Sequence, residues 1–184
     1  AIDFAAAQGL PRVAAVPVER RDGESATALA WRVLATVLDP EVPALSLVDL
    51  GIVREVQEAG AGLCVVLTPT YSGCPATEVI QQAVVTALQE AGARTVTVST
   101  TLDPPWTTDW ITPEAAEKLR AYGIAPPHLR AADAQTLHFH PKNIACPRCG
   151  SLNTQRLSAF GATACKALHR CLDCREPFEH FKPI

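Results

Sequence analysis

The chain has 184 residues, of which 48% are hydrophobic, and its mean hydropathy is mildly positive at +0.11. Such a chain can bury one core of ordinary size and carry one small second module. It lacks the run of about 18 apolar residues that a membrane-spanning helix needs and the basic start and apolar centre of a secretory signal, so it is predicted to be cytoplasmic, with no membrane partner.

The formal net charge of -3 is unevenly distributed. Residues 142–184 hold seven Lys or Arg against three Asp or Glu, whereas residues 1–141 hold nine against sixteen. This asymmetry indicates two modules with different neighbours. The predicted organisation, in chain order, is a flexible arm at 1–24, an α+β domain at 25–124, a linker at 125–143 and a zinc ribbon at 144–184.

The first half of the α+β domain is predicted as a helix followed by a hairpin. The helix starts at Ser25, has apolar residues recurring four apart, and stops before Asp39, because Pro40 disfavours helical geometry in the residue before it. Residues 51–56 and 63–68 are rich in β-forming side chains and flank a glycine-containing turn, which is typical of a β-hairpin.

A helix, a strand and a last helix are predicted in the second half of this domain. The first helix opens after Cys74, with Pro75 at its first position and Gly92 as its left-handed stop. Residues 95–101 alternate as a short strand, and the last helix is capped by Thr112. The order helix, strand, strand, helix, strand, helix predicts the α+β class, with a small mixed sheet and helices packed on it.

Two CxxC pairs, separated by 21 residues, mark the C-terminal module. Each pair can aim two sulfurs at one ion, and together they supply the four thiolates that structural zinc prefers. The predicted ligands are Cys146, Cys149, Cys171 and Cys174. A rubredoxin-like iron centre uses the same ligands and stays an alternative. Because so short a segment buries little apolar surface, the metal is expected to supply much of its folding free energy.

Other side chains in and near the ribbon are predicted to pack rather than to bind the metal. Cys165 and His169 lie between the CxxC pairs, but a complete four-sulfur set leaves no position for either. His138 and His140 are spaced like alternate residues of a strand, so a shared metal there is kept as a minor alternative. Three aromatic residues are expected to pack against the zinc core rather than to stack on bases: Phe160, Phe178 and Phe181.

Cys74 stands in a glycine-marked turn where a helix is predicted to begin. The unpaired N–H groups and positive dipole of such a helix end favour the thiolate, which makes Cys74 a candidate metal ligand or nucleophile. The alternative is a small buried apolar residue near a helix cap. Hydroxyl groups such as that of Thr70 lie nearby in the sequence, and Asp39 and Glu41 lie in a separate loop whose distance from Cys74 the sequence does not show.

These segments together resemble a known family. DPEVPALSLVDLGIV, LTPTYSGCPATEVI and PPWTTDWIT resemble the small domain of iron-sulfur assembly factors. With CPRCG, FGATACKALHRC and CREPFEHFK they are similar, more specifically, to the D-type accessory proteins of bacterial phenylacetyl-CoA epoxidase (phenylacetate-CoA oxygenase). The resemblance covers residues 25–182. It implies a helper in aerobic phenylacetate breakdown that assists assembly or repair of an iron or iron-sulfur centre in the oxygenase.

The resemblance also carries residue roles. The family's reactive cysteine matches Cys74, its acidic loop matches Asp39 and Glu41, and its zinc ligands match Cys146, Cys149, Cys171 and Cys174. The resemblance leaves open whether the protein carries a cluster itself or only contacts the client. One protein thiolate is too few for a stable cluster, which normally needs four ligands, and transient binding across a homodimer or with a client subunit would resolve that shortage.

The leading hypothesis is therefore an accessory factor without turnover chemistry, in which Cys74 is the thiolate ligand and the ribbon docks on a subunit of the epoxidase complex. Two rivals remain. A Cys74-dependent thiol enzyme would need a base such as His128 or His138, and both fall in the predicted linker. A nucleic-acid module would use the basic ribbon, and is the less favoured partner class.

Overall fold

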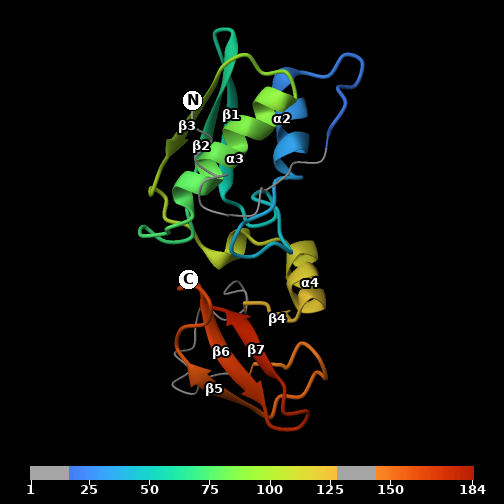
Figure 1. Ribbon diagram of the computed structural model, residues 1–184, viewed down its shortest axis with the longest axis vertical. Coiled ribbons are helices and arrows are strands. Elements are labelled where there is room, and N and C mark those ends of the chain that lie inside the picture. Colours follow the sequence, from blue (N-terminus) through green and yellow to red (C-terminus); the bar gives the residue numbers. More distant parts are fainter. Residues whose placement is uncertain (1–16, 128–143) are drawn as a thin grey trace, which may run out of the picture. The chain divides into compact units, whose positions relative to one another are not determined.

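The computed structural model describes residues 17–127 and 144–184 (Figure 1). The chain divides into two compact units, Ala1–Trp106 and Thr107–Ile184. His128, His138 and His140, with the hypotheses attached to them, lie outside the described residues, as do most of the predicted arm and linker.

The first unit is built on a three-stranded mixed sheet in the order β1-β2-β3. Strands β1 (Val53–Ala59) and β2 (Gly62–Leu67) form the predicted antiparallel hairpin, with Val56 opposite Val65. Strand β3 (Val96–Thr100) runs parallel to β2 on its other side, with Val98 also opposite Val65. Val65 is therefore the centre of the sheet, and it is fully buried.

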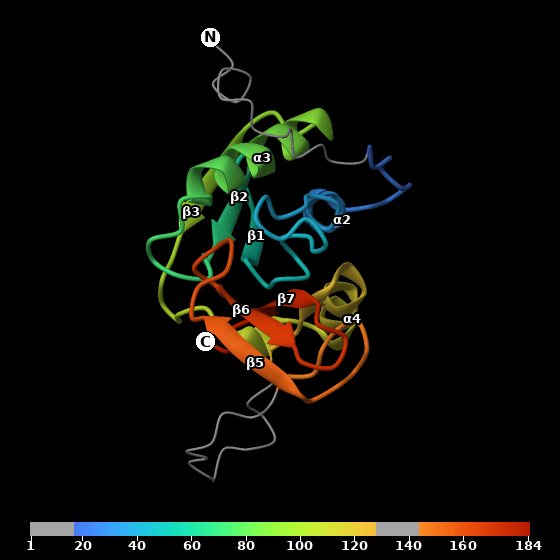
Figure 2. The same cartoon turned by 60° about the horizontal axis from the view of Figure 1, so that its bottom comes forward.

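Two helices pack against this sheet and against each other, α2 (Ala26–Leu34) and α3 (Thr77–Glu90) (Figures 1 and 2). Ser25 caps α2 as predicted, because its hydroxyl accepts a hydrogen bond from the N–H of Ala28 at 3.1 Å. The apolar stripes of both helices form the core with the sheet, and their buried members are Leu29, Ala30, Val33, Leu34, Ile80, Val84, Ala87 and Leu88.

The second unit contains a four-stranded sheet in the order β4-β7-β6-β5. Its elements in chain order are the 3-10 turn η1 (Thr108–Trp110), α4 (Pro113–Tyr122), β4 (Ile124–Ala125), β5 (Thr154–Ser158), β6 (Lys166–Cys171) and β7 (Pro177–Phe181). Thr112 caps α4 as predicted, accepting a hydrogen bond from the N–H of Ala115. Strands β5, β6 and β7 are antiparallel neighbours, and β4 lies parallel to β7.

The division after Trp106 differs from the domain boundary predicted at residue 124. Helix α4 and strand β4 belong to the second unit, because buried Ile124 and Ala125 pair with Glu179 and His180 of β7. Trp106 instead ends the first unit, where its buried indole N–H donates to the carbonyl of Leu50 at 2.9 Å. The α+β class, with a small mixed sheet, is confirmed.

None of the helices within residues 17–127 and 144–184 has both the length and the apolar character needed to cross a bilayer.

Candidate metal centre and thiol site

The four predicted ribbon cysteines lie in two similar backbone turns. In the first, the N–H of Gly150 donates to the carbonyl of Cys146 at 2.9 Å, and Gly150 has a φ of +74°. In the second, the N–H of Cys174 donates to the Sγ of Cys171 at 3.5 Å, and Arg175 takes the matching left-handed position with a φ of +65°. Only the glycine was visible as a sequence signal, because a left-handed arginine has no signature of its own.

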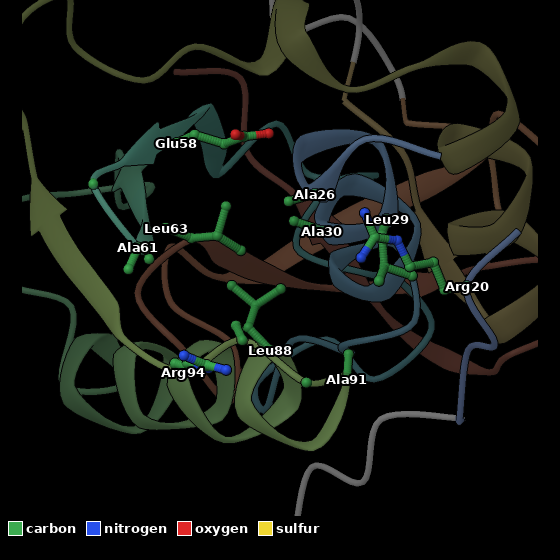
Figure 3. A pocket seen from close by; sticks show the side chains of 14 residues that line it. Arg20, Ala26, Leu29, Ala30, Glu58, Ala61, Leu63, Leu88, Ala91 and Arg94 are labelled. Carbon is green, nitrogen blue, oxygen red and sulfur yellow. The ribbon is translucent and has the colours of Figure 1, made fainter. Parts of the chain in front are cut away.

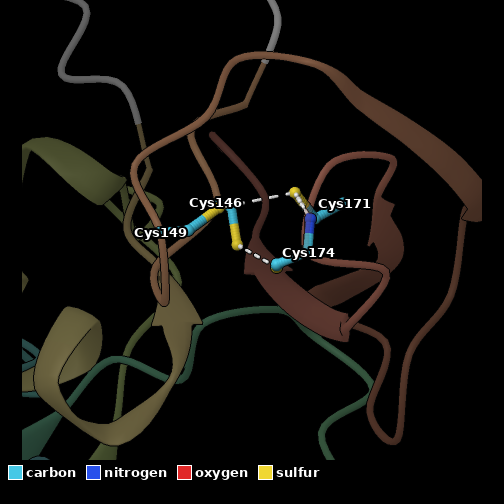
Figure 4. Close-up of side chains that lie close together, drawn as sticks. All are labelled: Cys146, Cys149, Cys171 and Cys174. Atoms are coloured by element: carbon cyan, nitrogen blue, oxygen red, sulfur yellow. Dashed lines mark hydrogen bonds between the residues drawn. The ribbon is translucent and has the colours of Figure 1, made fainter.

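The two turns bring the four sulfurs together (Figure 4). All four lie within 4.8 Å of one another, with 3.8 Å between the Sγ atoms of Cys146 and Cys174 and 3.6 Å between those of Cys149 and Cys171. A tetrahedral ion with metal–sulfur bonds of about 2.3 Å would set its sulfurs about 3.8 Å apart. The side chains therefore already stand at the spacing of a tetrahedral tetrathiolate site.

The pKa values of the ribbon thiols differ strongly. The backbone hydrogen bond from Cys174, with further bonds from Asp173 and the neighbouring thiols, lowers the pKa of Cys171 to about 7. A backbone hydrogen bond from Glu176 favours the Cys174 thiolate, but burial and hydrogen bonding with the other three thiols outweigh it and raise the pKa of Cys174 to about 12. Because a soft cation binds thiolates, filling this site must release protons.

Side chains outside the sulfur set tie the two turns together. The Asp173 carboxylate accepts hydrogen bonds from Ser151 Oγ at 2.5 Å and Asn153 Nδ2 at 2.7 Å, and these bonds lower the pKa of Asp173. Arg148 and Glu176 form an exposed ion pair at 2.6 Å. Such contacts fix ligand orientation around a metal site. They were not anticipated from the sequence, because they join residues 20 or more positions apart.

The remaining ribbon residues mostly have packing roles. Cys165 is buried with its Sγ 3.1 Å from Thr163 Oγ1, and the buried His169 ring stacks on Phe178 at 5.6 Å between centroids. Phe178 and Phe181 are buried, as predicted. Phe160 was predicted wrongly, because 63% of its surface is exposed.

Cys74 lies in the loop between β2 and α3, half-buried and three residues before the helix. The N-cap position is Ala76, which lacks a capping side chain, and Cys74 instead accepts at its carbonyl from the N–H and Oγ1 of Thr77 at 3.3 and 2.9 Å. Burial, followed by the charges of Glu41 and Asp39, raises the pKa of Cys74 and outweighs a backbone hydrogen bond from Ala76. The direction is opposite to the predicted stabilisation of the thiolate by the helix end, because burial and the two carboxylates outweigh the hydrogen bond from the N-cap residue Ala76.

The fold brings the acidic loop within electrostatic range of Cys74. After burial, the charges of Glu41 and Asp39 are the causes that raise the pKa of the Cys74 thiol. The buried Asp39 carboxylate also organises its own loop by accepting the N–H groups of Glu41 and Val42 at 2.9 and 2.7 Å. The ligand atoms of this trio are not clustered as tightly as the ribbon sulfurs, which are the one group of three or more such ligands found among the described residues.

Threonines line the same loop. The predicted Thr70 is half-buried in it, four positions before Cys74. Thr68 is fully buried, and its Oγ1 has no hydrogen-bond partner among the described residues. A buried hydroxyl without a partner is costly, so this loop carries a polar group that its own packing does not satisfy.

A cavity of about 330 Å³ opens elsewhere in the first unit (Figure 3). Figure 3 shows Arg20 and Arg94 on different sides of the apolar Leu63 and Leu88. The cavity is lined by neither Cys74 nor the acidic loop, so it is separate from the thiol site.

Comparison with known proteins agrees with the division of the chain into an N-terminal and a C-terminal unit. A family model described as "Iron-sulfur cluster assembly protein" matches residues 28–100, and one described as "PaaD zinc beta ribbon domain" matches residues 130–182. The class is therefore that of proteins that join an iron-sulfur-assembly domain to a zinc ribbon.

The chain is 50% identical over 155 residues to an Escherichia coli (strain K12) protein named as the D-type subunit of a "Putative 1,2-phenylacetyl-CoA epoxidase", an alignment that covers 84% of this chain and 91% of that protein. The chain belongs to the family of these D-type epoxidase subunits. The chain is also 33% identical over 90 residues to an "Fe-S protein maturation auxiliary factor" from Porphyromonas gingivalis, an alignment that covers 48% of this chain and 85% of that protein. A crystal structure of a domain of unknown function from Bacillus anthracis is 23% identical, covers 51% of this chain and 91% of its own, and has a TM-score of 0.44.

Proposed function

We propose that this chain is an accessory maturation factor of a phenylacetyl-CoA epoxidase system. Cys74 takes up iron in transit to an oxygenase subunit, and the ribbon is a zinc-stabilised module that docks on that subunit. The observation that carries the proposal is that Asp39 and Glu41, which are distant from Cys74 in sequence, lie within electrostatic range of it and, together with burial, raise the pKa of its thiol. Membership of the family of D-type epoxidase subunits supplies the client.

Four sulfurs at tetrahedral spacing support zinc in the ribbon. Cys146, Cys149, Cys171 and Cys174 would hold the ion, which contributes folding free energy and joins the two turns. Because all four ligands come from the protein, no coordination position is left for a substrate, and the role of this site is structural.

The surroundings of Cys74 suit transient binding of a cation. In the absence of a cation, burial and two neighbouring carboxylates keep the thiol protonated. A divalent iron ion offsets the repulsion of Asp39 and Glu41, so its arrival releases the Cys74 proton. A single sulfur with two carboxylates falls short of the four ligands of a stable cluster, so the remaining ligands would come from the client.

The same electrostatics argue against a thiol enzyme. A nucleophilic cysteine needs a lowered pKa or an adjacent base, and the described surroundings of Cys74 supply two carboxylates and burial, which raise its pKa.

The test is complementation by Cys74→Ala in cells that lack the wild-type chain. The iron content and turnover of the purified epoxidase are expected to fall. Cys64→Ala is the matched control, because Cys64 is a half-buried cysteine of the same unit that belongs to strand β2 rather than to the thiol loop. Full iron content in the Cys74→Ala strain would reject the proposal.

A further inference from the structure

Phe160 is an aromatic side chain displayed at the surface of the ribbon. It lies in the loop between β5 and β6, and 63% of its surface is exposed. Leu157, three residues earlier in β5, is 52% exposed. A large exposed aromatic side chain is the type of group that anchors many protein interfaces.

The loop that carries Phe160 is held by hydrogen bonds at successive residues. The N–H of Phe160 donates to Ser158 Oγ at 3.1 Å, and the N–H of Gly161 donates to the carbonyl of Lys166 at 2.8 Å. The exposed ring is therefore carried on an ordered backbone.

A largely buried ion pair between strands β6 and β7 lies next to this loop. Lys166 Nζ lies 2.8 Å from Glu179 Oε2, and the Lys166 side chain is only 5% exposed. The other oxygen of Glu179 accepts the N–H of Ala162 at 2.6 Å. A Cβ added to Gly161 would lie 2.5 Å from this oxygen, so a larger residue there would require the Glu179 carboxylate to shift.

Lys182 adds a positive charge to the surface. Its Nζ lies 4.6 Å from the centroid of the Phe160 ring and donates to the carbonyl of Ala159 at 3.3 Å. One face of the ring is thus covered by an ammonium group, which leaves its edge and other face for a partner. We call Phe160 and Lys182 the Phe160 surface.

We propose that the Phe160 surface is the anchor by which the ribbon docks on an oxygenase subunit, one that offers an apolar pocket rimmed by carboxylates. The inference rests on the proposed function for the identity of that subunit. An aromatic anchor held in place before binding loses little conformational entropy, which is typical of interface hot spots. Lys182 selects an acidic rim.

The test measures binding of the zinc-loaded full chain to purified epoxidase oxygenase by biolayer interferometry. Phe160→Ala is expected to weaken binding roughly thirtyfold, as loss of a hot-spot residue does. Lys182→Glu is expected to weaken it as well and to reduce its dependence on salt. Tyr122→Ala is the matched control, because Tyr122 is an aromatic residue of the same unit with 58% exposure, and it should bind like wild type. Zinc content and melting temperature verify the fold of each variant.

The outcomes separate the two proposals. Wild-type binding that Phe160→Ala and Lys182→Glu leave unchanged would overturn the docking assignment and leave the proposed function standing. Failure of the wild-type chain to bind the oxygenase would reject the proposed client, and the assignment with it. A dimer that Phe160→Ala converts to monomer, or DNA binding that it abolishes, with oxygenase binding intact, would assign the surface to a second copy or to nucleic acid and also overturn the inference.

Discussion

The buried ion pair of the ribbon gives the sharpest stability prediction. Glu179→Gln removes the carboxylate charge that lies 2.8 Å from Lys166 Nζ, yet keeps an oxygen able to accept the N–H of Ala162. The substitution therefore changes the charge more than the shape. A positive ammonium remains in a site where its side chain is 5% exposed.

Removal of one partner from a buried ion pair costs about 3 to 5 kcal/mol. The Glu179 side chain is 23% exposed, so water screens the pair in part and the lower end, about 3 kcal/mol, is expected. For a unit of this size that loss corresponds to a fall of roughly 12 to 24 °C in melting temperature. The double variant Lys166→Met/Glu179→Gln removes both charges and should recover most of the stability.

Hydrogen exchange of the zinc-loaded chain, read by mass spectrometry, measures the effect in peptides of β6 and β7 separately from the first unit. Exchange in α3 serves as the internal control. A loss below about 1 kcal/mol for Glu179→Gln would refute the reasoning, because that is the scale of an exposed pair. A double variant as unstable as the single one would refute it too.

Three further predictions concern the candidate sites. Gly150→Ala should destabilise the ribbon by about 1 to 2 kcal/mol through its left-handed φ alone. Gly73→Ala, with a φ outside that region and an added Cβ at an ordinary contact distance of 4.0 Å from Tyr71 Cε2, should be near neutral in denaturant unfolding. Because the pKa of Cys74 is raised, iodoacetamide should label this thiol slowly at neutral pH and faster as the pH rises above the ordinary range of a thiol pKa. Glu41→Gln should lower the pKa of Cys74 and so speed the labelling. Equal labelling rates for the wild type and Glu41→Gln would contradict this prediction. Cys171→Ser should abolish stoichiometric zinc binding in metal analysis, and retained zinc would contradict the tetrathiolate site.

Much of the fold could be predicted from the sequence, because it depends on interactions between residues close together in the chain. The caps at Ser25 and Thr112, the left-handed stop at Gly92 and the hairpin of β1 and β2 each depend on residues a few positions apart, and each was found where predicted. The start of α3 was misplaced, because Pro75 also fits the turn that precedes the helix.

Contacts between distant residues escaped sequence reasoning. The loop that carries Phe160 is bonded through Ala162 to Glu179, 17 positions further along the chain, and the pKa of Cys74 is raised by burial and by two carboxylates more than 30 positions earlier. Neither partner is marked by spacing or periodicity.

The α+β class, the two CxxC turns and the candidate metal ligands could be predicted from the sequence, because they depend on periodicity and on ligand chemistry within short segments. The clustering of the four sulfurs within 4.8 Å, the electrostatic effect of Asp39 and Glu41 on Cys74, and the pairing of β4 with β7 of the ribbon could be found in the folded chain alone. Burial and Coulomb interactions depend on distance in space, and the folded chain alone sets that distance.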